Sequence, residues 1–191
     1  SITVTVAAKL LGAKRKGQLV AAAFAISIPM GLLQATSTQN DFVTALWLII
    51  MIVFILYACQ EEPSWAEILS IGAALGLGLL TKGTFYPYAV PWGVWLVVHW
   101  IKQKRWVVFL RRSLAIIIIV VMLNAGYWVR NIITYGGPLG PAQWVSSMTT
   151  GNKGLKPIAS NLVKNITINL ATPSTKINNM MVDFIKSTFQ S

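Results

Sequence analysis

The sequence predicts an all-α fold, a polytopic bundle of membrane helices with about five spans. A truncated helix comes first, and an amphipathic helical tail lies on the outer face. Apolar residues make up 55% of the 191-residue chain and charged residues only 11%, about half the charged share of a globular protein. Five apolar runs approach the roughly 20 residues that a membrane crossing needs. The cations, which give a net charge of +11, stand in short clusters between these runs.

The first eleven residues, SITVTVAAKLL, resemble the second half of a membrane helix, and we expect the chain to be an internal piece of a larger protein. The third apolar run carries Glu67 near its start and the small-residue stretch GAALGLG at 72–78. We therefore expect this run to pack against protein instead of facing lipid. The predicted spans are 18–34, 42–59, 65–81, 85–101 and 113–129.

The distribution of cations predicts the orientation. Two loops on one side hold nine Lys and Arg residues, whereas the two short loops on the other side hold only Lys82. The positive-inside rule places the two basic loops in the cytoplasm and everything after about Arg130 outside. This clustering at the edges of apolar runs favours membrane lipid over nucleic acid as the partner of the cations. The nine cations are Lys9, Lys14, Arg15, Lys16, Lys102, Lys104, Arg105, Arg111 and Arg112.

Two domains follow from this reading, a transmembrane helical region at 1–129 and an outer, periplasmic region at 130–191. In the outer region, YGGPLGPAQW is a turn-rich loop. Apolar residues then recur at helical spacing in 157–170 and again in 172–189, where Pro173 and Ser174 signal a helix start. Neither stretch is apolar enough to span. We expect two amphipathic helices that lie on the membrane surface or on another part of the protein.

Three polar clusters converge on the outer face, at 35–42, 81–88 and 124–140. Ionisable groups at membrane depth are costly, so they usually face a protein interior or a wet cavity. Cations there suit a phosphate, and aromatic side chains suit a sugar ring or the headgroup zone. The clusters supply Gln39, Asn40, Asp41, Lys82, Tyr86, Tyr88, Asn124, Tyr127, Trp128, Arg130, Asn131 and Tyr135.

Each candidate also has a simpler explanation. Lys82 could extend to lipid headgroups, Asp41 could cap the second span, and Arg130 could be an interfacial anchor. His99 has no carboxylate or Cys beside it in the sequence, which argues against a metal site there. The stretch Asn165-Ile-Thr167 matches a glycosylation acceptor, a pattern that is common by chance.

Several of these stretches resemble the GT-C membrane glycosyltransferases, which include protein O-mannosyltransferases and the bacterial lipid A aminoarabinose transferase. GAALGLGLLTKGTFYPYAVPW is similar to the segment of that family that contains LTKG and a later Pro. ATSTQNDFVTALW resembles a polar outer loop whose Asp opens the next helix, and YWVRNIITYGGPLGP resembles the stretch where the chain leaves the membrane. NLATPSTKINNMMVDFI is similar to the outer helical region of bacterial members.

The resemblance implies an integral glycosyltransferase of the bacterial inner membrane that transfers a sugar from a polyprenyl-phosphate donor, with inversion, to a glycan, lipid or protein acceptor outside. The catalytic base of the family would lie upstream of Ser1, and Asp41 matches a later, supportive acidic position. Lys82 and Arg130 match cations near the donor phosphate. No metal ligands are assigned, and the need for a divalent ion stays open. The substrate cavity would include Gln39, Asn40, Tyr86, Tyr88, Tyr127, Asn131 and Tyr135.

Other classes of membrane protein remain as alternatives. A transporter predicts inverted repeats and polar groups near the midplane, whereas this chain has no repeat and gathers its polar residues at the outer ends, apart from Asn124. A flippase or polymerase of lipid-linked glycans would share the lipid-phosphate substrate. A non-catalytic membrane scaffold would need no substrate at all.

Overall fold

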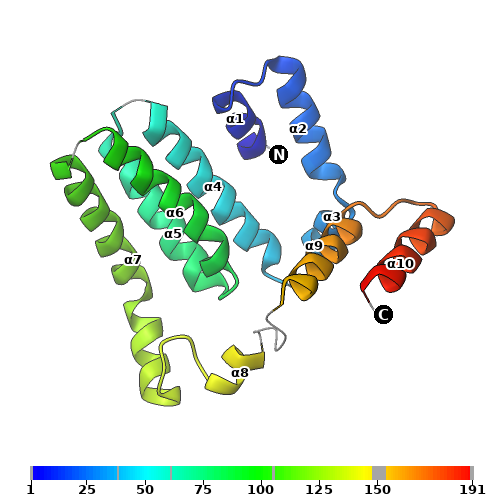
Figure 1. Ribbon diagram of the computed structural model, residues 1–191. Helices are drawn as coiled ribbons and strands as arrows, with labels where there is room; N and C mark the ends of the chain where they lie inside the picture. Colours follow the sequence, from blue (N-terminus) through cyan, green and yellow to red (C-terminus); the bar gives the residue numbers. More distant parts are fainter. Residues whose placement is uncertain (1, 38, 61, 105, 148–153, 190–191) are drawn as a thin grey trace.

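The computed structural model describes residues 2–37, 39–60, 62–104, 106–147 and 154–189, and this part of the chain contains helices but no strand. The all-α prediction is confirmed, because a helix forms over each predicted run (Figure 1). In chain order the helices are α1 (Ile2–Leu10), α2 (Arg15–Ser27), α3 (Pro29–Ala35), α4 (Asp41–Gln60), α5 (Trp65–Thr81), α6 (Phe85–Lys102), α7 (Trp106–Tyr135), α8 (Ala142–Ser147), α9 (Leu155–Asn169) and α10 (Thr175–Phe189).

Two helices are long and apolar enough to cross a membrane: α4, and the part of α7 from Phe109 to Tyr135. α2 and α3 together would make a third span, although the pair is bent by 61°. α5 is apolar but has only 17 residues, whereas α6 has 18 residues but is not among the helices with enough hydropathy to cross. Two or three of the five predicted spans are therefore long and apolar enough to cross a membrane, and the spans at α5 and α6 stay predictions.

The first predicted run, 18–34, is broken where α2 meets α3. Ile28 has φ −62° and ψ 116°, an extended conformation, and Pro29 begins α3. A proline ring excludes the residue before it from the α region and fits the first position of a helix. Pro29 therefore ends α2 and starts α3 in a new direction.

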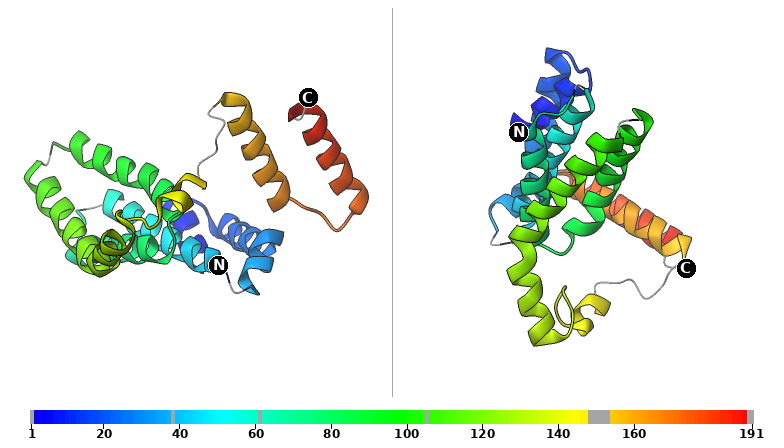
Figure 2. Two further views of the ribbon diagram at one scale, coloured as in Figure 1. Left: turned by 90° about the horizontal axis from the view of Figure 1, so that it is seen from below. Right: turned by 90° about the vertical axis from the view of Figure 1, so that its left-hand side faces the viewer.

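α5 lies between α4 and α7 and has a well-defined start (Figures 1 and 2). The Ser64 side chain accepts a hydrogen bond from the Glu67 amide at 3.3 Å, and the Glu67 carboxylate accepts one from the Ser64 amide at 2.9 Å. This is a capping box, which satisfies two backbone donors at the helix start. Glu67 therefore caps the start of α5. The close packing of α5 depends on its glycines instead.

Gly76 lies in the close contact between α5 and α7. A Cβ added to Gly76 would lie 2.7 Å from Cδ1 of Leu123 and 3.5 Å from the amide nitrogen of Asn124. That amide donates to the Gly76 carbonyl at 3.0 Å and to the Val120 carbonyl at 3.0 Å, and Asn124 is fully buried. The missing side chain thus allows a polar contact between α5 and α7.

The core lies among α4, α5, α6 and α7, and the outside of these helices is apolar too. Only 11% of the candidate span of α7 and 33% of that of α4 are buried inside the protein. Ile117, Ile118 and Met122 of α7 are exposed. Contiguous apolar surface on this scale fits a lipid solvent. The core is formed by Met51, Ile55, Ala58, Ile68, Ile71, Ala74, Leu79, Phe85, Ala89, Leu96, Trp100 and Val120.

The basic loops and the polar clusters lie at opposite ends of the bundle. At one end, Gln60 donates to the Leu10 carbonyl at 2.9 Å, and the Arg111 guanidinium lies 5.2 Å from the centre of the Trp65 ring. The first contact joins the ends of α1 and α4, and the second joins the starts of α5 and α7, all on one side of the bundle (Figures 1 and 2). Arg105 lies outside the described residues. The cytoplasmic location of this end stays a prediction.

The predicted amphipathic helices are present as α9 and α10. α9 packs beside α3, and α10 packs beside α9, away from α4–α7 (Figure 2). Ile158 and Leu162 of α9 and Met180 and Phe184 of α10 are exposed. That these apolar faces lie on the membrane surface or on another part of the protein stays a prediction.

We predict that replacing Gly76 by Leu destabilises the protein by about 1–3 kcal/mol, because the new side chain forces α5 away from α7. Thermal unfolding in detergent would measure the loss. Gly93→Leu in α6 is the matched control, because a Cβ there meets nothing within 4 Å. Equal melting temperatures for Gly76→Leu and Gly93→Leu would contradict the close approach.

Candidate functional site

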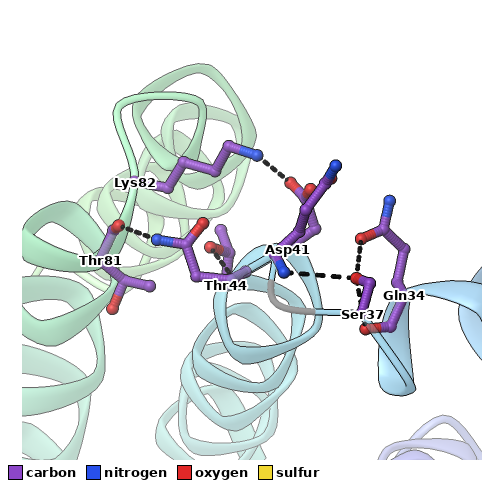
Figure 3. A network of polar contacts seen from close by, with 8 residues as sticks. Gln34, Ser37, Asp41, Thr44, Thr81 and Lys82 are labelled. Atoms are coloured by element: carbon purple, nitrogen blue, oxygen red, sulfur yellow. Dashed lines mark hydrogen bonds and ion pairs between the residues drawn. The ribbon is translucent and has the colours of Figure 1, made fainter.

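The candidate site centres on an ion pair between the start of α4 and the end of α5. The ammonium group of Lys82 donates a hydrogen bond to Oδ1 of Asp41. The two side chains point toward each other across the gap between the helix ends (Figure 3). They are 32% and 35% exposed, so a ligand can reach both of them. The polar clusters at 35–42 and 81–88 therefore meet, as their placement on one face predicted.

A hydrogen bond next to the ion pair fixes the distance between the two helix ends. The side-chain amide of Asn40 donates to the Thr81 carbonyl at 2.8 Å, although 41 residues separate them (Figure 3). The Thr81 hydroxyl donates to the Leu77 carbonyl at 2.6 Å, and the Thr44 hydroxyl donates to the Asn40 carbonyl at 2.9 Å. The Asn40 side chain thus joins the two helix ends beside the ion pair, and the two threonine bonds each stay within one helix end.

Asp41 occupies the first turn of α4. A carboxylate there is stabilised by the positive end of the helix dipole. Upstream, the Ser37 hydroxyl donates to the Gln34 carbonyl at 3.1 Å, and the Gln39 amide donates to Ser37 Oγ at 3.3 Å. The turn before α4 is therefore held locally, with the Gln39 side chain exposed. Asp41 combines a position at the helix start with a specific cationic partner.

Lys82 is positioned by the turn from α5 to α6. Its amide donates to the Gly78 carbonyl at 3.3 Å, and its carbonyl accepts from the Phe85 amide at 3.0 Å. The Phe85 ring is fully buried against Gly78, where an added Cβ would lie 2.3 Å from Cζ of the ring. Phe85 thus anchors the turn, and Lys82 projects from an anchored backbone toward Asp41.

Aromatic side chains of α6 and α7 meet beside this turn. The Trp128 ring nitrogen donates to the Tyr86 hydroxyl at 3.2 Å. Tyr86 and Tyr127 are half-buried, whereas Tyr88 is 62% exposed and Tyr135 is 52% exposed. The structure therefore brings Tyr86 and α7 together and leaves Tyr88 and Tyr135 on the surface.

The third polar cluster is held mainly by contacts within itself. The Arg130 guanidinium lies 5.7 Å from the centre of the Tyr127 ring, one helical turn earlier on α7. Asn131 is buried, and its side-chain amide donates to the Pro138 carbonyl at 3.0 Å. Asn131 thus fixes the loop after α7. Arg130 is exposed on its helix, and its described ring contact is with Tyr127.

The described residues contain no group of three or more His, Cys, Asp or Glu side chains that could hold a metal ion. His99 lies near the other end of α6, where its Nε2 is 2.8 Å from the side-chain nitrogen of Gln103. The arrangement at Asp41 and Lys82 consists of one carboxylate and one ammonium group. An incoming anion can replace the carboxylate as the partner of the ammonium group.

A comparison with protein families matches residues 2–128 of this chain to a family model described as dolichyl-phosphate-mannose-protein mannosyltransferase. The matched stretch contains Asp41 and Lys82 and ends two residues before Arg130. No curated protein and no solved structure matches the chain.

We predict that the ion pair contributes little to stability. A double-mutant cycle of Asp41→Asn, Lys82→Gln and the double variant should give a coupling energy of about 0.2–1 kcal/mol, because partly exposed ion pairs are screened by solvent. Unfolding of the purified protein in detergent, at low and high salt, measures it. A coupling above about 2 kcal/mol that persists at high salt would make the pair a structural connection instead of an exchangeable one.

Proposed function

The chain belongs to the dolichyl-phosphate-mannose-protein mannosyltransferase family, and on that premise we propose that it transfers a sugar from a polyprenyl-phosphate donor to an acceptor at the outer face of the membrane. The family consists of membrane glycosyltransferases of the GT-C type. The observation that carries the proposal is the Asp41–Lys82 pair, which lies inside the matched stretch and at the end of the bundle opposite the basic loops.

The proposed role of Lys82 is to bind the donor phosphate. In the transfer, the bond between the anomeric carbon and the phosphate oxygen breaks, and its electron pair stays on the phosphate. A fixed cation stabilises the negative charge that develops there more than water does. The Lys82 ammonium group is on an anchored turn and partly exposed, so it can turn from Asp41 to an incoming phosphate.

Asp41 has a supporting role in this proposal. Without donor, its carboxylate is the counter-ion of Lys82 and directs the ammonium group toward the start of α4. When the phosphate displaces it, the carboxylate stays at the edge of the site. The acceptor hydroxyl forms the new bond to the anomeric carbon and gives its proton to a general base.

Other polar groups at this end extend the proposed site. Arg130 offers a second cation to the phosphate, and the aromatic rings of Tyr86, Tyr88 and Tyr127 offer faces for the sugar. Gln39, Asn40 and Tyr135 add hydrogen-bonding groups, whereas Asn131 supports the site by holding the loop after α7. Each of these roles is part of the proposal.

We also propose that this end faces the outside of a bacterial inner membrane. The cations Lys14, Lys16, Lys102 and Lys104 belong to the opposite end of the bundle, the end that the positive-inside rule assigns to the cytoplasm. A lipid-linked donor presents its phosphate at the membrane boundary. A site made from helix ends is at the same level.

Asn124 bears on the transporter alternative. It is the polar residue nearest the middle of α7, and its amide bonds to Gly76 and Val120 inside the packed interface of α5 and α7. It therefore fastens two helices to each other instead of lining a substrate path, and no observation favours a transporter over a transferase.

We predict that Lys82→Ala lowers sugar transfer at least about 100-fold, the usual cost of removing one group that stabilises transition-state charge. The assay uses the purified full-length protein and radiolabelled polyprenyl-phosphate sugars. Lys186→Ala, which removes an exposed lysine of α10, is the matched control. Turnover unchanged by Lys82→Ala, in protein that still inserts in the membrane, would refute the role of Lys82.

A second prediction separates Asp41 from Lys82. Asp41→Asn should tighten binding of labelled polyprenyl phosphate by up to about fivefold, because Lys82 no longer has to leave a charged partner. Equilibrium binding in detergent measures this independently of turnover. Weaker binding by Asp41→Asn would mean that the carboxylate holds Lys82 in place for the ligand.

A further inference from the structure

A second feature lies near the other end of α6, where one face of the helix forms an open hollow of about 490 Å³. The lining residues recur every three or four positions, so they form a single stripe along the helix. Four of them are apolar, and the stripe ends in His99 and Lys102. The residues are Pro91, Val94, Trp95, Val98, His99 and Lys102.

The stripe has no cover in the described part of the chain. Val94 is 56% exposed, Trp95 is 54% exposed and Val98 is 42% exposed. The Trp95 ring stacks on Trp92, with ring centres 6.0 Å apart, which gives the stripe a firm aromatic wall. An apolar stripe of this kind needs an apolar occupant.

Charge indicates what kind of occupant fits. The six lining residues include no acidic side chain. Lys102 and Lys104 are exposed at the end of α6, and Arg111 and Arg112 lie within the first two turns of α7. An apolar helix laid over the stripe would bury Lys102 without a counter-charge, which is costly. An occupant with an apolar tail and an anionic head avoids that cost.

Length leads to the same conclusion. From Pro91 to Lys102 the helix rises about 16 Å, which is about half the thickness of a bilayer's hydrocarbon core. One acyl chain of a phospholipid crosses that same half. With its tail along Val94 and Val98, its headgroup phosphate would reach the level of Lys102.

We propose that this stripe is a binding site for an anionic phospholipid, whose acyl chain packs on Trp95 and Val98 and whose headgroup pairs with Lys102. The headgroup position at Lys102 lies about 26 Å along α6 from Phe85, the first helical residue after the turn that carries Lys82. It is therefore separate from the proposed donor site, and its existence does not depend on the proposed activity.

The test captures the lipid directly. The photoreactive residue p-benzoylphenylalanine replaces Val98 in the full-length protein, which is placed in nanodiscs of equal phosphatidylglycerol and phosphatidylcholine. After irradiation, mass spectrometry identifies the adduct. We expect phosphatidylglycerol adducts to exceed phosphatidylcholine adducts by about fivefold, the typical contribution of one lysine at an anionic surface.

A charge variant serves as the second measurement. Lys102→Gln should bring the adduct ratio close to one, whereas the matched control Lys186→Gln, on α10, should leave it unchanged. If the Val98 variant fails to fold, p-benzoylphenylalanine in place of the more exposed Val94 serves instead. Equal adducts from both lipids, or crosslinking to a peptide of the protein itself, would overturn the proposal.

Discussion

The arrangement of the bundle depends on how closely α5 approaches its neighbours. α5 lies between α4 and α7, and several of its glycines, Gly76 and Gly78 among them, lie where a side chain would meet another group. At Gly76 the space is taken by Leu123 and Asn124 of α7, and at Gly78 it is taken by the Phe85 ring. The second contact fixes the turn into α6, and therefore fixes the point from which Lys82 extends. In lipid, where apolar surface alone gives helices little reason to associate, such close packing and the Asn124 bonds supply the specificity.

The sequence was sufficient to predict the helices and their relative direction, because apolar runs and cation clusters are strong signals of a lipid solvent. It also placed Asp41 and Lys82 at the same end of the bundle. It did not predict their direct contact, since that depends on the rotation of α4 and α5 about their axes, which the packing of Gly76 and Phe85 decides. The break at Ile28 had a visible signal in Pro29, and the capping box had one in the Ser-Trp-Ala-Glu order of 64–67. In each stretch the long apolar run was the stronger signal, so neither the break nor the capping box was predicted.

The ion pair is placed where it costs the fold little. The positive end of the α4 dipole favours the Asp41 carboxylate, and the end of α5 presents backbone carbonyls, near which a lysine is favourable. Both side chains remain about one-third exposed, so neither bears the full penalty of desolvation. The hydrogen bond from the Asn40 side-chain amide to the Thr81 carbonyl holds the helix ends together independently of the charges. The pair can therefore open for a ligand without loosening the helices that carry it.

The two proposals for the ends of α6 give one residue type two functions. Lys82, just before the helix, already has a carboxylate partner, so an incoming anion binds only if it competes successfully with Asp41. Lys102, at the far end, lies in a stripe whose lining has no acidic side chain, so under the second proposal an anion with an apolar tail meets no internal competitor there. Competition with an internal partner gives selectivity, as a substrate site requires, whereas attraction without competition suits an abundant lipid. The local counter-charge, more than the net charge of +11, therefore determines what each lysine can bind.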